Sequence, residues 1–143
     1  MKPLQPVLAV GAVVLHEGRL LLVRRMQPPA VGAWSVPGGR VEPGETLTAA
    51  VAREVLEETG LLVAVDELVG WVERTGDAYH FVILDFFAHV LGDDLEPVAG
   101  DDAGEARWVE AADLDELPLV AGLADFLRDH GVHLGTGGGS GKD

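Results

Sequence analysis

Three glutamates, Glu54, Glu57 and Glu58, fall within five consecutive positions, and clustered carboxylates bind divalent cations or move protons. On a helix over residues 46–59 they lie within an arc of roughly 100°. Like charges at these i,i+3 and i,i+4 spacings destabilise a helix, and its C-terminus disfavours anions. A divalent cation between the carboxylates would reverse the sign of this interaction. The alternative is a solvated acidic helix face on which Arg53 offsets part of the charge.

The residues around this cluster follow a fixed spacing from Gly39 to Leu61. Gly39 is followed after five residues by Glu45, after seven more by Arg53-Glu54-Val55, then by Glu57-Glu58 and by Gly60-Leu61, with one residue in each of the last two gaps. This segment fits the Nudix box at every specified position, and Pro37-Gly38 before it also matches. The chain resembles the Nudix hydrolases, and its order of elements follows that family from about residue 6 to residue 130.

The resemblance implies a Mg²⁺-dependent hydrolase, with Mn²⁺ as a substitute, that cleaves a pyrophosphate bond in a small nucleotide. The substrate would be a nucleoside diphosphate linked to another group, as in a nucleoside triphosphate or ADP-ribose. The implied fold is an α/β/α sandwich around a mixed β-sheet, with the box as a loop–helix–loop. The alternative is a Nudix module that senses a nucleotide without cleaving it. The intact box favours the enzyme.

The resemblance also assigns roles within the box. Glu57 and Glu58 match metal-binding glutamates, and Glu54 matches a residue that is a metal ligand or the general base. The resemblance also places Arg53 among the catalytic residues. Arg53 and Glu45 match a pair that braces the loop against the helix. Gly38 and Gly39 match a tight turn whose carbonyl reaches a metal.

Outside the box the candidates are less specific. Family members often draw one more carboxylate from the loop before the last strand, and Asp102 is the first choice here, with a solvated acidic loop as the alternative. Arg25 and Arg40 resemble phosphate-contacting positions, or are ordinary surface arginines. Tyr79 is a candidate for substrate binding. Trp34, Trp71, Tyr79 and Phe81 could each stack on a base, although core packing is the usual role of such side chains, and His80 and His89 are weaker candidates for catalysis.

Length and composition set the limits for this interpretation. At 143 residues, with 48% hydrophobic residues, the chain is expected to form a single domain over 1–133, followed by a flexible glycine-rich tail over 134–143. A net charge of −14 argues against nucleic acid as a partner. The absence of cysteine and of a long apolar run favours a cytoplasmic protein without a membrane partner. A homodimer remains open.

Hydrophobic patterning and turn residues predict the elements that must position the box. Residues 26–38 are expected to form a loop, and Leu119, Leu123, Phe126 and Leu127 to share one face of the last helix. The predicted strands are 6–15, 19–25, 61–75 with a break near Asp66 and Glu67, 79–91 and 106–110, and the predicted helices are 46–59 and two closing helices over 111–117 and 119–130.

Overall fold

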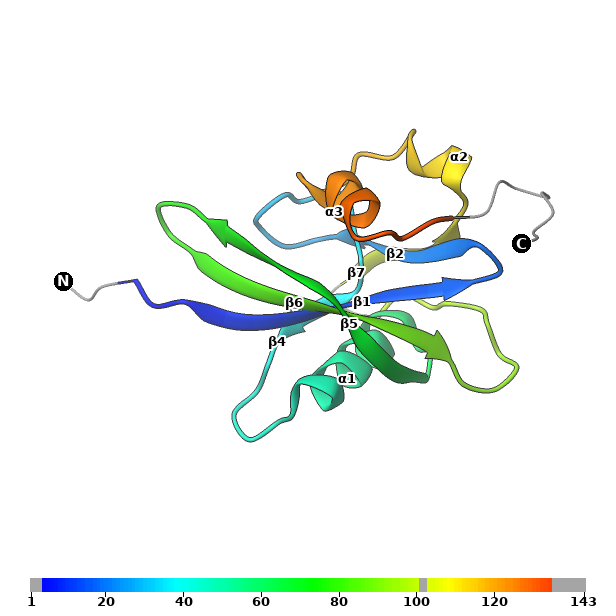
Figure 1. Ribbon diagram of the computed structural model, residues 1–143, viewed down its shortest axis with the longest axis horizontal. Helices are drawn as coiled ribbons and strands as arrows, with labels where there is room; N and C mark the ends of the chain where they lie inside the picture. Colours follow the sequence, from blue (N-terminus) through cyan, green and yellow to red (C-terminus); the bar gives the residue numbers. More distant parts are fainter. Residues whose placement is uncertain (1–3, 101–102, 135–143) are drawn as a thin grey trace.

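The computed structural model describes residues 4–100 and 103–134, which form seven strands and three helices (Figure 1). In chain order these are β1 (Val7–His16), β2 (Arg19–Arg25), β3 (Trp34–Ser35), β4 (Gly38–Arg40), α1 (Leu47–Thr59), β5 (Val63–Thr75), β6 (His80–Val90), β7 (Ala103–Val109), α2 (Ala111–Leu114) and α3 (Leu123–Asp129). Asp102 and residues 135–143 of the expected tail lie outside the described residues. Leu134, which the sequence analysis placed in the tail, packs against the core.

A mixed sheet runs through the middle of the molecule. β1 pairs with β6 in parallel and with β2 and β4 in antiparallel orientation. β5 extends the sheet beyond β6, and both β3 and β7 pair with β2. α1 covers one face, and α2 and α3 lie on the other (Figure 1). The predicted α/β/α arrangement around a mixed sheet is therefore confirmed.

Burial on both faces explains why β1 shows so little alternation between apolar and polar residues. Val10 and Ala12 pack toward α1 with Val51 and Val55, whereas Val13 faces the opposite way, in the cluster that includes residues of α3. Full burial of one aliphatic side chain contributes roughly 1.5–3 kcal/mol. Apolar residues on both sides of this strand therefore fix it as the centre of the fold and hold α1 at one face.

The strand expected over 61–75 contains the predicted irregularity. Its pairing register with β6 shifts between Val65 and Leu68 and again between Leu68 and Gly70. The sequence Asp66-Glu67 falls in the first shift, where extra residues on one strand are accommodated as a bulge. The predicted break is confirmed, and the strand continues beyond it to Thr75.

Parts of the predicted secondary structure are wrong in detail, and the strand predicted over 106–110 runs from Ala103 to Val109. The loop expected over 26–38 includes all of β3 and the start of β4, which are too short for periodicity to reveal. Both closing helices are shorter than predicted: α2 ends at Leu114, and α3 starts late because Gly122, in a left-handed conformation with φ of 85°, precedes it. Leu119 therefore lies outside α3, where it bridges to Trp34. None of the described helices is long and apolar enough to cross a bilayer.

One carboxyl group, that of Asp85 on β6, is buried in the face of the sheet covered by α3. Asp85 is 5% exposed, and its Oδ1 has no hydrogen-bond partner among the described residues. This oxygen lies over Gly11 on the neighbouring strand, where any Cβ would overlap it. Burial raises the pKa of the Asp85 carboxyl to about 6, although Arg74 and His130 act in the opposite direction. The fold therefore disfavours the ionised form of this group.

Asp85→Asn should make the protein more stable near neutral pH. A carboxyl whose pKa is raised by folding destabilises the native state as pH increases from its ordinary value of 3.8 through about 6. The increase in the free energy of unfolding caused by Asp85→Asn should therefore be small at pH 4 and reach up to about 3 kcal/mol at pH 7.5. Urea unfolding of both proteins at the two pH values measures it, and a variant that is less stable at pH 7.5 would contradict this account.

Candidate active site

The helix that carries the three glutamates begins and ends where its sequence predicts. The Thr46 side chain accepts a hydrogen bond from the Ala49 N–H at 3.2 Å, which caps the first turn. Gly60 ends the helix in a left-handed conformation with φ of 75°, and its N–H donates to the Leu56 carbonyl at 2.9 Å. Val51 and its apolar neighbours on α1 are buried against the sheet. The charged residues consequently project from the remaining surface of α1.

Arg53 is the centre of the polar network on this helix. Its guanidinium donates to both oxygens of Glu45, at 2.6 and 2.9 Å, and to Glu54 Oε2 at 3.0 Å. It also donates to Glu57 Oε1 at 3.2 Å and to the Arg40 carbonyl at 3.0 Å. The predicted bracing contact between Arg53 and Glu45 is therefore present. Glu45 and then Glu54 raise the pKa of Arg53, so this cation is permanent.

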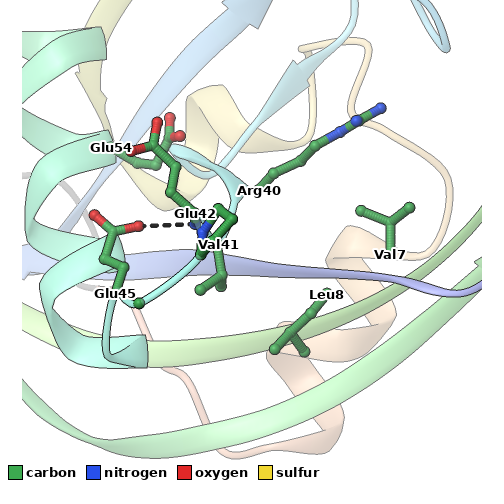
Figure 2. A pocket seen from close by; sticks show the side chains of 9 residues that line it. Val7, Leu8, Arg40, Val41, Glu42, Glu45 and Glu54 are labelled. Atoms are coloured by element: carbon green, nitrogen blue, oxygen red, sulfur yellow. Dashed lines mark hydrogen bonds between the residues drawn. The ribbon is translucent and has the colours of Figure 1, made fainter.

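The loop before α1 is closed by a second set of contacts to Glu45. The Glu45 carboxylate accepts a hydrogen bond from the Glu42 backbone N–H at 3.0 Å (Figure 2). In return, the Glu45 N–H donates to the Glu42 carbonyl at 3.0 Å. Hydrogen bonding by Arg53, and then by the Glu42 backbone, lowers the pKa of the Glu45 carboxyl to about 2. Glu45 thus joins loop and helix as a fixed anion.

Glu54 and Glu58 face each other beside Gly38 and Gly39, which belong to strand β4 and not to the tight turn that the resemblance implied. The Glu54 carboxylate lies so close to Gly39 that any Cβ at this position would overlap it. Burial and then the Glu54 carboxyl raise the pKa of the Glu58 carboxyl well above its usual range. The Gly38 backbone N–H and Arg25 act in the opposite direction without reversing the shift. The structure therefore brings Gly39, Glu54 and Glu58 together, as the box predicts.

Glu57 is placed differently from the other two glutamates. Its side chain is 57% exposed and is bound to Arg53, whereas the Glu54 side chain is 13% exposed. Among residues 4–100 and 103–134, no three carboxylate, imidazole or thiol side chains converge on one point as a preformed cation site. The predicted cluster of three glutamates is thus a close pair with a third carboxylate turned toward Arg53.

Arg25 is engaged by the chain itself. Its guanidinium donates to the carbonyls of Pro29 at 2.7 Å, Gln27 at 3.2 Å and Pro28 at 3.4 Å. These contacts fix the loop that follows β2. Arg25 is also close enough to Glu58 to act on its ionisation. The role of this arginine as a phosphate contact stays a prediction, and its observed role is to order the loop.

Arg40 and Tyr79 both lie near the Phe81 ring. The Arg40 guanidinium is 5.8 Å from the centre of the Phe81 ring, and the Tyr79 and Phe81 rings are also 5.8 Å apart. Arg40 lines a pocket of about 660 Å³ that reaches Glu54. Val7 and Leu8 at the start of β1 form its opposite wall (Figure 2). Sequence analysis missed both of these as lining residues, because they look like ordinary strand residues.

The remaining candidates lie apart from the carboxylate pair. Trp34 is in the core at 5% exposure, whereas Trp71 is 61% exposed. His80 pairs with Glu73 at 3.0 Å, and His89 pairs with Asp66 at 2.9 Å. Core packing therefore accounts for Trp34, and pairing at the surface accounts for both histidines.

Comparison with known proteins decides the family. The NUDIX domain model matches residues 5–130, which is most of the chain. The chain belongs to the NUDIX family. It is accordingly a hydrolase that acts on nucleotide pyrophosphate substrates.

Relatives and solved structures agree with this assignment. An ADP-ribose pyrophosphatase of Methanocaldococcus jannaschii is 40% identical over 133 residues, covering 87% of this chain and 75% of the relative. A putative 8-oxo-dGTP diphosphatase 2 of Mycobacterium tuberculosis is 37% identical over 131 residues, with 88% of each chain covered. The crystal structure of a MutT NUDIX hydrolase from Burkholderia pseudomallei superposes with a TM-score of 0.72 at 32% identity, covering 87% of this chain and 97% of that one.

Glu45→Gln should destabilise the protein at neutral pH and lose this effect in acid. A carboxyl whose pKa is lowered by folding stabilises the native state above its ordinary value of 4.5, and this stability is lost as pH falls toward about 2. Urea unfolding of the variant and the wild type at pH 7, 5 and 3 should show a difference in the free energy of unfolding that becomes smaller as the pH falls.

Glu42→Gln is the matched control for this change. The Glu42 side chain is 65% exposed and lies 3.8 Å from Arg53, so its loss should cost little. Equal destabilisation by the two substitutions would rule out the bracing role of Glu45. So would a difference in unfolding free energy between Glu45→Gln and the wild type that does not depend on pH.

Proposed function

We propose that this NUDIX protein is a Mg²⁺-dependent pyrophosphohydrolase whose cation is held by the carboxylates of α1. The observation that carries the proposal is the close approach of Glu54 and Glu58 beside Gly38 and Gly39. Two carboxyl groups in this position resist simultaneous ionisation, and burial and then the Glu54 carboxyl raise the pKa of Glu58 accordingly. A bound divalent cation would allow both to be charged.

The chemistry of the donors fits a hard cation. Glu54 and Glu58 supply carboxylate oxygens, and the Gly39 carbonyl and Glu57 are further oxygen donors within the box. Mg²⁺ prefers such ligands and retains several waters, so it does not need a complete protein cage. This preference is consistent with a carboxylate pair in place of three converged side chains. Mn²⁺ would bind the same donors, and Asp102 stays a candidate for an additional ligand.

When bound, the cation would neutralise the diphosphate and make an attacking water more acidic. The role of the chain is to position the reactants and accept a proton. We assign Glu54 as the residue that takes the proton from water. Its carboxylate is oriented by a hydrogen bond from Arg53, and the absence of a side chain at Gly39 leaves space for it. The oxygen of water forms a bond to phosphorus, and the bridging oxygen of the diphosphate leaves with the electron pair.

The substrate class follows from the relatives and from the shape of the site. The names of the two relatives specify ADP-ribose and 8-oxo-dGTP, each a nucleoside diphosphate linked to a further group. The pocket between β1 and the box loop reaches Glu54, so one part of such a molecule could lie there while its diphosphate meets the carboxylates. Arg40 and Tyr79 are the proposed contacts at the edge of this site. A free nucleotide suits the chain better than a nucleic-acid strand, given its charge of −14.

Activity should depend completely on a divalent cation. Protein treated with excess chelator should not hydrolyse any member of a panel containing nucleoside triphosphates, 8-oxo-dGTP and ADP-ribose. Mg²⁺ or Mn²⁺ should restore activity on at least one of them, measured as released phosphate, pyrophosphate or nucleoside monophosphate. Full turnover in chelator would refute the proposed mechanism, and no turnover of any member with either metal would refute the proposed substrate class.

A further inference from the structure

An irregular segment between β6 and β7 binds the last turn of α1. The Val98 N–H donates to the Thr59 carbonyl at 2.8 Å, and the Gly100 N–H donates to the Glu58 carbonyl at 3.1 Å. The last carbonyls of a helix have no partners within the helix, so they must be satisfied from outside it. Two of these carbonyls in α1 are satisfied by backbone N–H groups about forty positions further along the sequence.

The approach at Gly100 is closer than any other residue would allow. A Cβ at this position would overlap the Glu57 carbonyl oxygen and would lie 3.6 Å from the Glu58 Cα. The obstructing atoms belong to the backbone of α1, so they cannot rotate away as the end of a side chain could. Glycine is therefore needed here because of contact with the turn that carries Glu57 and Glu58.

The segment contributes through its backbone and is anchored at its other end. The Val98 side chain is 67% exposed, and Gly100 has no side chain. Upstream, the Trp108 indole N–H on β7 donates to the Leu95 carbonyl at 2.7 Å. The N–H groups also face the negative end of the helix dipole, close to the glutamates that this end disfavours. The contacts thus fix the position of the last turn and offset part of its charge.

We propose that the segment Val98–Gly100 is a positioning element for the carboxylates of the metal site. It determines where Glu57 and Glu58 stand by holding their backbone, without touching the cation or the substrate. This inference rests on the proposed function, since it concerns the site where the cation binds. Its test therefore measures metal binding and protein stability as well as turnover.

Gly100→Ala should weaken metal binding much more than it affects nucleotide binding. We expect the dissociation constant for Mn²⁺, measured by electron paramagnetic resonance of the free ion, to rise about tenfold or more. The Mg²⁺ concentration for half-maximal activity should rise in parallel, while KM for the nucleotide at saturating Mg²⁺ changes less than about twofold. Ala99→Ser, at the exposed position between the two donors, is the control and should match the wild type.

A second pair of variants tests the hydrogen bond separately from the steric contact. Val98→Pro removes the N–H that binds Thr59, whereas Val98→Ala shortens the same exposed side chain and keeps the N–H. Mn²⁺ binding should weaken in Val98→Pro and remain unchanged in Val98→Ala. Circular dichroism melts of all four variants in chelator show whether each protein is folded.

The outcomes separate this inference from the proposed function. Wild-type Mn²⁺ affinity in a folded Gly100→Ala, or equal affinity in the two Val98 variants, would overturn the positioning role alone. Unfolding of both Gly100→Ala and Val98→Pro would also overturn it, because the segment would then support the whole fold. Failure of the wild type to bind Mn²⁺ or hydrolyse any nucleotide would instead refute the proposed function.

Discussion

The candidate site depends on the placement of one cation, the guanidinium of Arg53. It binds Glu45 in the loop, Glu54 and Glu57 on the helix, and the Arg40 carbonyl at the end of β4. Loop, helix and strand are all linked to this one group. A guanidinium suits the position because it presents several donors in a rigid plane and keeps its charge. Without it, the anionic loop and the anionic helix would repel each other.

Arg53 does not neutralise the whole carboxylate cluster. The carboxylate that it leaves unbound explains the chemistry that we assign to the site. Glu45, Glu54 and Glu57 all receive hydrogen bonds from Arg53, but Glu58 does not. Glu58 is half-buried beside Glu54, at the end of α1 where the helix dipole disfavours anions. The unfavourable electrostatics are therefore concentrated on one carboxylate pair. A site that violates local rules at one point, in an otherwise consistent fold, is where function is expected.

Sequence predicted the parts of this arrangement that depend on local chemistry. Thr46 and Gly60 marked the ends of α1, and Asp66-Glu67 marked the irregularity in β5, because caps and bulges are encoded by nearby residues. The contacts of Arg25 with the following loop, and those of Gly100 with α1, were not predictable in this way. The Gly100 contact joins backbone atoms that are distant in the sequence, and the Arg25 contacts depend on the conformation of an irregular loop, which residue type alone does not predict. The short strands β3 and β4 were missed because pairing with β2 and β1, rather than periodicity, defines them.

The most direct test of the account is the stability of wild type and Glu58→Gln, each unfolded by urea with excess chelator and with saturating Mg²⁺. In chelator, the variant should be at least as stable as the wild type, because the amide replaces a carboxyl group whose ionisation is disfavoured by burial and by Glu54. Mg²⁺ at about 100 times its dissociation constant should stabilise the wild type by about 2.7 kcal/mol, and the variant by much less. A variant that unfolds in chelator, or that gains as much from Mg²⁺ as the wild type, would show that Glu58 is a structural residue and contradict the account.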